Sequence, residues 1–312
     1  MGRMDVRPIG GSGLATPRLV LGGNVFGWTA SGAEAFAILD RFAEAGGTMI
    51  DTADVYSAWV PGHKGGESEA LLGEWLKRSG RKDVMIATKV GFMAGLKASE
   101  IARAADASLK RLGVEAIDLY YAHKDDEATP LEETLVAFDA LVRAGKVRAI
   151  GASNFSAERL AEALAVSERE GLARYQVLQP EYNLMTRTGY EGALQQLCAA
   201  EGIGVLPYFG LAAGFLTGKY RREEDFGKSI RGTRMAAYLN ECGLKVLAAL
   251  DEVAAETGAS PAQVALAWLA AQPGVTAPIA SATSLAQLED LLGVLTLDLS
   301  EEHVERLSTA SA

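Results

Sequence analysis

Residues 50–56 read I-D-T-A-D-V-Y and place the carboxylate of Asp51 five positions before the phenol of Tyr56. This segment begins in an apolar run, and later apolar runs also end in polar side chains. If the runs are parallel strands of one sheet, their carboxyl ends lie at the same edge and the polar side chains converge on one site. The side chains at the later run ends are Lys89, His123, Ser153, Asn154, Gln179 and Tyr208.

Apolar runs alternate with amphipathic segments, as in a parallel sheet that is covered by helices. Eight strands, each followed by a helical segment, predict an α/β fold, namely a (β/α)8 (TIM) barrel with extra helices. Residues 4–18 predict an N-terminal β-hairpin around the turn G-G-S-G. The expected strands are 19–22, 48–51, 84–88, 117–121, 147–151, 176–179, 203–207 and 275–280. The expected helices are 33–45, 67–79, 99–112, 131–144, 156–169, 190–201, 243–257 with 261–271, 284–292 and 301–308.

Capping residues support these helix boundaries. Thr129, Ser260 and Ser284 each precede a helical run and carry a glutamate or glutamine three residues later, so each is expected to cap its helix. Glycine follows several helical runs, as expected for helix C-termini. These glycines are Gly46, Gly113, Gly145, Gly171 and Gly202.

A doubly wound open sheet is the structural alternative to the barrel. Such a sheet normally carries G-x-G-x-x-G after its first strand. Here Gly11 and Gly13 lie in the hairpin turn without a third glycine, and no G-x-x-x-x-G-K-[S/T] loop occurs. No Pro/Ser-rich linker or repeat divides the sequence, so we expect residues 1–312 to form a single barrel domain.

Composition excludes several other classes of protein. Apolar residues make up 49% of the 312, enough for a sizeable core, and the net charge of −10 argues against nucleic-acid binding. No apolar run is suited to span a bilayer, and the start M-G-R-M-D-V-R-P shows no export signal. Cys198 and Cys242 are expected to be buried thiols in a reducing cytosol. They give no metal-ligand spacing with His63, His123 and His303, so we expect a cytoplasmic protein without a metal.

Asp51, Tyr56, Lys89 and His123 have complementary chemistry. A phenol can protonate a carbonyl oxygen that is becoming an alkoxide, and a neighbouring ammonium is expected to lower the phenol pKa. A carboxylate keeps the amine charged and oriented, and an imidazole can donate to the same oxygen. Taken singly, each residue also has a structural explanation in packing or ion pairing. Together they indicate proton delivery during carbonyl reduction or its reverse.

Longer stretches resemble the aldo-keto reductase superfamily, and the resemblance runs nearly end to end. The family fold is the (β/α)8 barrel, and its chemistry is the NAD(P)H-dependent reduction of aldehydes and ketones. The resemblance implies a small carbonyl substrate and a catalytic tetrad of Asp51, Tyr56, Lys89 and His123, with Tyr56 as proton donor. The stretches are G-G-S-G-L, D-T-A-D-V-Y, G-E-S-E-A-L-L-G-E-W-L, I-A-T-K, S-L-K-R-L-G-V-E-A-I-D-L-Y-Y-A-H, G-K-V-R-A-I-G-A-S-N-F, Q-P-E-Y-N-L and F-L-T-G-K-Y.

The same resemblance implies residues that contact the nicotinamide. Ser153, Asn154 and Gln179 would hold its carboxamide, because hydroxyl and amide groups can satisfy that group. Tyr208 would stack on one face of the ring while hydride leaves the other face. Asp51 is also counted among the cofactor contacts.

Other residues match positions along the rest of the cofactor. Gly23 and Asn24 correspond to positions near the ribose. Leu211, Gly214 and Lys219 belong to a loop that would cross the pyrophosphate, where the glycine permits close approach and the lysine supplies charge.

Two departures from the family pattern concern the choice of cofactor. Phe209 stands where many relatives have a serine that faces phosphate, and Thr283 stands where many NADPH users have arginine. Ser281, Thr283 and Gln287 can still bind a 2′-phosphate at the start of a helix. We expect NADPH, and NADH remains open.

The expected substrate pocket is aromatic, and its selectivity should depend on loop 57–66 and segment 214–240. The alternatives to a reductase are a cofactor-binding regulatory or sensor subunit with little turnover and a non-redox barrel enzyme. The substrate, the reaction direction and a homo-oligomeric state are left open. The pocket residues are Trp28, Trp59, Phe92 and Lys124.

Overall fold

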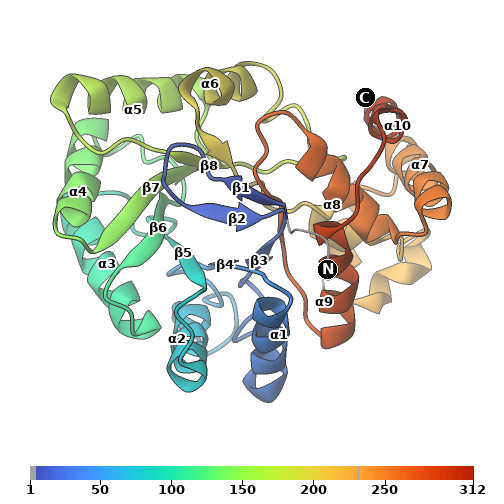
Figure 1. Ribbon diagram of the computed structural model, residues 1–312, viewed down its shortest axis with the longest axis horizontal. Coiled ribbons are helices and arrows are strands. Elements are labelled where there is room, and N and C mark those ends of the chain that lie inside the picture. The colour runs from blue at the N-terminus through green and yellow to red at the C-terminus, as the bar shows by residue number, and fades with distance from the viewer. Residues whose placement is uncertain (1–4, 231) are drawn as a thin grey trace.

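The computed structural model describes residues 5–230 and 232–312. Within these residues an eight-stranded parallel sheet has the order β10-β3-β4-β5-β6-β7-β8-β9, and Figure 1 shows its strands surrounded by helices. The strands are β3 (Val20–Gly22), β4 (Met49–Asp51), β5 (Met85–Val90), β6 (Ile117–Ala122), β7 (Val147–Ser153), β8 (Val177–Gln179), β9 (Gly204–Val205) and β10 (Ile279–Ala280).

The two edge strands of this sheet are joined by further parallel contacts. Val205 in β9 forms a parallel bridge with Val275, and the amide of Thr276 donates to the carbonyl of Val205 at 2.8 Å. Nearer the mouth, the amide of Ile279 donates to the carbonyl of Pro207 at 2.9 Å. The sheet therefore closes, and the predicted (β/α)8 barrel is confirmed.

Helices cover the outside of the barrel, and their bounds agree with the sequence prediction to within three residues (Figure 1). Between β9 and β10 the chain forms two α-helices, and a last helix follows the barrel, as the sequence predicts. The helices are α1 (Gly32–Glu44), α2 (Glu67–Ser79), α3 (Ala98–Leu112), α4 (Leu131–Arg143), α5 (Ala157–Glu170), α6 (Ala193–Glu201), α7 (Glu241–Thr257), α8 (Pro261–Ala271), α9 (Leu285–Leu292) and α10 (Glu301–Ala310).

The predicted N-terminal hairpin pairs β1 (Val6–Pro8) with β2 (Ala15–Pro17), and Met4 of the predicted range lies outside the described residues. Figure 1 shows the hairpin crossing the centre of the ring of strands. Ile9 is fully buried in the barrel interior with Val20 and Met49, at the start of β3 and β4. The hairpin thus closes the end of the barrel opposite the carboxyl ends of the strands.

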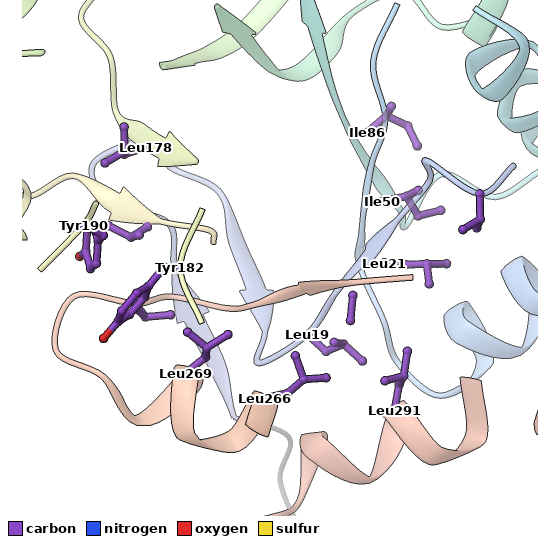
Figure 2. Packing of buried hydrophobic residues seen from close by; sticks show 14 of the residues in the cluster. Leu19, Leu21, Ile50, Ile86, Leu178, Tyr182, Tyr190, Leu266, Leu269 and Leu291 are labelled. Atoms are coloured by element: carbon purple, nitrogen blue, oxygen red, sulfur yellow. The ribbon is translucent and has the colours of Figure 1, made fainter. Parts of the chain in front are cut away.

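Leucine side chains attach the helices to the sheet. Figure 2 shows Leu266 on α8 and Leu291 on α9 pointing toward Leu19 and Leu21, and all four belong to one buried cluster. Burying a leucine stabilises a fold by about 1.5–3 kcal/mol, so the helices and barrel support each other. No helix among the described residues is long and apolar enough to cross a membrane.

Two of the three predicted N-caps form. Ser260 accepts from the amide of Gln263, whose side chain accepts from the amide of Ser260, and Ser284 also caps its helix. The Thr129 prediction is wrong, because Pro130 occupies the N-cap position of α4. The hydroxyl of Thr129 donates instead to the nearby Asp126 carboxylate at 2.7 Å, a charged and therefore stronger acceptor.

The two cysteines differ in their surroundings. Cys198 on α6 is buried, whereas Cys242 is exposed, so the prediction of two buried thiols is wrong for Cys242. Cys242 lies in the first turn of α7, whose buried face is formed by residues such as Val246 and Leu250. Its exposure reflects its place at the start of the helix, because Val246, four residues later on the same side, is buried.

Candidate active site

A buried ammonium joins Asp51, Thr52 and Tyr56 at the mouth of the barrel. Lys89 in β5 donates to Oδ1 of Asp51, to the carbonyl of Thr52 at 2.7 Å and to Oη of Tyr56 at 2.9 Å. An ammonium has three N–H donors, so all three are engaged. Because the Tyr56 oxygen accepts from Lys89, the phenol proton points elsewhere and can be donated to another group.

Burial controls the ionisation of this cluster. Burial raises the pKa of Asp51, and the charge of Lys89 opposes this rise only in part. Burial disfavours the charged form of Lys89, but Asp51 and Tyr56 outweigh burial and raise the pKa of the amine. Lys89 lowers the pKa of Tyr56, as the sequence predicts, but burial raises it by more, so the net shift is upward. At neutral pH the phenol retains its proton.

His123 follows β6 and lies across from the phenol, with its ring centroid 6.0 Å from that of Tyr56. Burial lowers the pKa of His123 to about 2, and the charges of Lys89 and Lys124 add to this effect. The imidazole is therefore neutral and carries one N–H donor. Its Nδ1 is buried without a hydrogen-bond partner in the described part of the chain.

Gln179 holds the second oxygen of the Asp51 carboxylate. At the end of β8, its side-chain amide donates to Oδ2 of Asp51 at 2.8 Å. Ser153, at the end of β7, donates from its hydroxyl to the backbone carbonyl of Gln179 at 2.8 Å. Both residues are buried, so the orientation of Asp51 is fixed from two sides by β5 and β8.

Asn154 links three strand ends at the mouth. Its side-chain nitrogen donates to the carbonyl of His123 at 2.9 Å, and its oxygen accepts from the hydroxyl of Tyr208 at 2.7 Å. Asn154 has a positive φ of 57°, an uncommon conformation for a residue other than glycine. The tyrosine ring is thereby fixed beside the mouth.

Backbone strain is concentrated around this mouth. In the described residues, the non-glycine positions with positive φ are Ser57, Asn154, Phe209, Ala212 and Ala213. Ser57 and Phe209 directly follow two residues of the mouth, and the hydroxyl of Ser57 donates to the carbonyl of Phe26 at 2.9 Å. Strained conformations of this kind persist where the surrounding structure holds them, often at functional sites.

A groove of about 640 Å³ begins at Asp51 and Tyr56 and continues toward α9. This volume lies in the range of small-molecule and cofactor sites. Nine of the thirteen predicted cofactor contacts line the groove, whereas Gly23, Ser153, Asn154 and Gln179 are not among its lining residues. The nine are Asn24, Asp51, Tyr208, Leu211, Gly214, Lys219, Ser281, Thr283 and Gln287.

Polar side chains at the α9 end of the groove are held in place by hydrogen bonds to one another. Oε1 of Gln287 accepts from the amide and the hydroxyl of Thr283, at 2.9 and 3.0 Å, which leaves its nitrogen as a donor. The hydroxyl of Ser281 donates to Oδ1 of Asn24 at 2.7 Å. Among the groove residues that the structure describes, Lys219 is the one cation. Neutral donors, a helix start and one cation suit the ribose and phosphate groups of a dinucleotide.

Some residues of the groove were missed by sequence reasoning. Ser229 and Ile230 line the groove beside η1 (Ala212–Thr217), η2 (Glu223–Lys228) and η3 (Gly232–Ala237). These elements occupy the predicted 214–240 segment, of which residue 231 lies outside the described part. The segment was expected to matter for selectivity, but its polar sequence gives no signal for which side chains face inward.

The four predicted pocket residues lie around the mouth but do not line the groove. Trp59 packs edge-on against Trp28 and Tyr56, with ring centroids 5.5 and 6.1 Å apart. Phe92 lies 4.8 Å from the ring of His123, and the amine of Lys124 lies 5.2 Å above Phe92. The rings therefore flank the phenol and the imidazole.

A barrel with a phenol–ammonium pair beside a groove of cofactor size fits an oxidoreductase of the nicotinamide-dependent type. A sequence model of the aldo/keto reductase family matches residues 18–312, and the chain belongs to this family. The protein is accordingly an NAD(P)H-dependent oxidoreductase.

Individual relatives match most of the chain, and two of the three described here are named as an oxidoreductase or a reductase. An uncharacterized oxidoreductase, YrpG, of Bacillus subtilis is 35% identical, over 98% of this chain and 95% of its own. An aldo-keto reductase, yakc [NADP(+)], of Schizosaccharomyces pombe is 31% identical, over 88% and 81%. A probable voltage-gated potassium channel subunit beta of Oryza sativa is 32% identical, over 94% and 91%.

Proposed function

We propose that this protein reduces a small aldehyde or ketone to an alcohol with NADPH, and that Tyr56 donates the proton. The observation that carries the proposal is the 2.9 Å hydrogen bond from Lys89 to Oη of Tyr56, at the end of the groove. This bond leaves the phenol proton available toward the mouth, where a carbonyl oxygen would lie.

The cofactor would supply a hydride to the carbonyl carbon. The Tyr56 hydroxyl donates its proton to the carbonyl oxygen as negative charge develops there. The nearby ammonium of Lys89 then stabilises the resulting phenolate, and Asp51 keeps the amine in place. In the reverse direction the phenolate accepts the proton from the alcohol.

His123 orients the carbonyl group in this proposal. Its pKa of about 2 keeps the ring neutral, so it donates a hydrogen bond without competing with Tyr56 as an acid. Neutral donors of this kind stabilise charge on an oxygen without a second proton transfer. Trp28, Trp59, Phe92 and Lys124 would surround the rest of the substrate.

Several groups would hold the nicotinamide end of the cofactor. Ser153 and Asn154 have polar side chains beside Tyr208, whose ring would stack on the nicotinamide. Gln179 holds Asp51 through its nitrogen, and its amide oxygen can accept from the carboxamide. Gly23 contributes through its backbone, since a side chain there would meet the carbonyl of Asp51.

The preference for NADPH over NADH is supported by the α9 end of the groove. The nitrogen of Gln287 and the start of α9 can donate to a 2′-phosphate. Leu211, Gly214 and Lys219 adjoin the path of the pyrophosphate. The NADP(+) in the name of the fission-yeast relative favours the same choice.

Parallel titrations with NADPH and NADH, followed by an aldehyde and ketone panel, test the proposal. We expect tighter binding of NADPH and its consumption with at least one carbonyl compound. Tighter binding of NADH would overturn the cofactor preference. Tight NADPH binding without consumption across the panel would overturn the reductase activity.

The second candidate is a cofactor-binding regulatory subunit with little turnover. The observation that favours it is the 32% identity to a protein named as a probable potassium channel subunit beta. Both candidates require NADPH binding, but only a reductase consumes the cofactor in stoichiometric amounts with alcohol formation. Product analysis after many turnovers separates the two.

A further inference from the structure

The first turn of α2 holds the strand ends that carry the site. Ser68 and Glu69 are fully buried consecutive residues of this helix. The hydroxyl of Ser68 donates to the carbonyl of Gly23, just after β3, at 2.8 Å. Its oxygen also lies 2.8 Å from the hydroxyl oxygen of Thr52, just after β4.

The direction of the second bond follows from the number of protons. A serine hydroxyl has a single proton, and that of Ser68 is given to the carbonyl of Gly23. The hydroxyl of Thr52 must therefore donate to the oxygen of Ser68. The amide of Thr52 donates to the carbonyl of Ala87 at 2.8 Å, so the residue is fixed at both its backbone and its side chain.

The carbonyl of Thr52 is one of the three acceptors of Lys89, at 2.7 Å. If this carbonyl turned away, the ammonium would lose one of its three bonds and would reorient between Asp51 and Tyr56. The direction of the Lys89 amine toward the phenol thus depends on the hydroxyl of Ser68, which acts through Thr52 and bonds to neither Lys89 nor Tyr56.

Glu69 makes a parallel connection to β5. Its Oε1 accepts from the hydroxyl of Thr88 at 2.6 Å, and its Oε2 accepts from Nε of Arg111 at 2.6 Å. Thr88 directly precedes Lys89 in the strand. Helix α2 thereby bonds to Thr52, whose carbonyl accepts from Lys89, and to Thr88, the residue before Lys89.

We propose that Ser68 is a positioning residue, which acts through the Thr52 hydroxyl to aim the Lys89 ammonium at Tyr56. The proposal rests on the proposed function, because it assigns to this hydrogen-bond chain a role in proton donation. Misplacing a catalytic group by about 1 Å can cost about 100-fold in rate, so a partial reorientation should cost about tenfold.

Thr52→Val and Thr52→Ser test the proposal, since valine keeps the shape and serine keeps the hydroxyl. We expect kcat to fall about tenfold in Thr52→Val with KM within about threefold, and to stay within about twofold in Thr52→Ser. In Ser68→Ala kcat should fall at least as far as in Thr52→Val, because this variant loses the bond to the Gly23 carbonyl as well as the bond from Thr52. In the double variant kcat should fall no further than in Ser68→Ala, because the Thr52–Ser68 bond is already absent there. Ser167→Ala is the matched control. Ser167 lies on α5, is also buried, and donates from its hydroxyl to a backbone carbonyl.

The pH dependence of alcohol oxidation separates positioning from a merely structural role. Lys89 lowers the pKa of Tyr56. A misdirected ammonium should therefore shift the part of the pH–rate profile that reports ionisation of Tyr56 to higher pH, by about half a unit or more. A parental kcat in Thr52→Val would overturn the proposal, and so would a loss of kcat in Thr52→Ser as large as that in Thr52→Val. A loss of kcat in the double variant equal to the product of the two single losses would also overturn it.

A measurement without turnover keeps this proposal distinguishable from the reductase activity. The Lys89 ammonium can be observed by its 15N resonance, which is assigned by its loss in Lys89→Met. The protons of this ammonium should exchange with water faster in Thr52→Val than in the parent. Unchanged exchange would overturn the positioning role even in an active enzyme. Faster exchange in a protein that consumes no NADPH would support the positioning and overturn the reductase activity alone.

Discussion

The side-chain amide of Gln179 donates to Oδ2 of Asp51 at 2.8 Å, while Oδ1 accepts from Lys89. The carboxylate is therefore held from opposite sides of the barrel. Burial alone would favour the protonated acid, and these two partners oppose that tendency. Gln179 thus has a role at the carboxylate in addition to the one implied for it at the cofactor.

Replacing Gln179 should affect catalysis more than cofactor binding. In Gln179→Met we expect kcat to fall about tenfold, because one hydrogen bond to a charged group is lost, at a cost of about 1.5–3 kcal/mol. The Kd of NADPH, measured by fluorescence titration, should rise by less than about threefold. Gln195→Met, at a half-buried glutamine on α6 that donates to the carbonyl of Pro273, should change neither value. A rise in Kd that exceeds the loss in kcat would indicate a role only at the cofactor.

Asp54 should make the stability of the protein depend on pH. Burial, and then the charge of Glu69, raises the pKa of Asp54 to about 7. The folded protein therefore binds this proton more tightly than the unfolded chain does, and stability falls as pH rises from about 4 to about 7. At pH 8, Asp54→Asn should be more stable than the parent by about 1–3 kcal/mol, and the difference should shrink at pH 4.

Urea unfolding at the two pH values measures this effect. Asp83→Asn, at an exposed carboxylate paired with Arg81, serves as the control and should change stability by less than about 0.5 kcal/mol at both. A stability gain of the same size at pH 4 and pH 8 in Asp54→Asn would show that ionisation of Asp54 is not its cause.

The N-terminal hairpin should contribute to stability without contributing to the site. Ile9 is fully buried at the closed end of the barrel, so Ile9→Ala should lower the free energy of unfolding by about 2–4 kcal/mol. Val6→Ala, at a side chain that is 55% exposed on the same hairpin, should cost less than about 0.5 kcal/mol. NADPH binding should be the same in both variants. Equal destabilisation by the two changes would argue against the packing of Ile9 in the barrel.

Trp59 should determine substrate preference. The residue is 48% exposed, and its ring packs against Trp28 and Tyr56 beside the mouth, outside the groove. In Trp59→Ala the ratio of kcat/KM between an aromatic and an aliphatic aldehyde should change by about tenfold or more, since aromatic contacts contribute about 0.5–1.5 kcal/mol beyond burial. The Kd of NADPH should change by less than about twofold. An equal loss for all carbonyl compounds would contradict this role.

Strand ends were the most informative feature of the sequence. A parallel sheet brings its carboxyl ends together, so the proximity of Asp51, Tyr56 and Lys89 could be predicted from apolar runs alone. The bond from Ser68 to Gly23 could not, because it joins residues 45 apart and no residue pattern marks it. The pKa of Tyr56 also required the structure, because burial and the nearby charge act in opposite directions.

Local competition explains the other errors. Thr129 has the sequence of an N-cap, but Asp126 lies three residues before it and takes its hydroxyl. Cys242 lies in the first turn of α7, which begins two residues before the predicted helix, and the sequence of that turn does not reveal which of its residues are exposed. Such details depend on the neighbours of a side chain in space, which a helical period does not specify.

The most direct test of this account is the comparison of Tyr56→Phe with the parent enzyme, in NADPH binding and in carbonyl reduction. Phenylalanine keeps the ring and its contacts with Trp59 and His123 but removes the proton. We predict that kcat falls by about 100-fold or more, the contribution expected of a positioned acid, while the Kd of NADPH stays within about threefold. Reduction of aldehydes by Tyr56→Phe at the parental rate would contradict the assignment of Tyr56 as the proton donor.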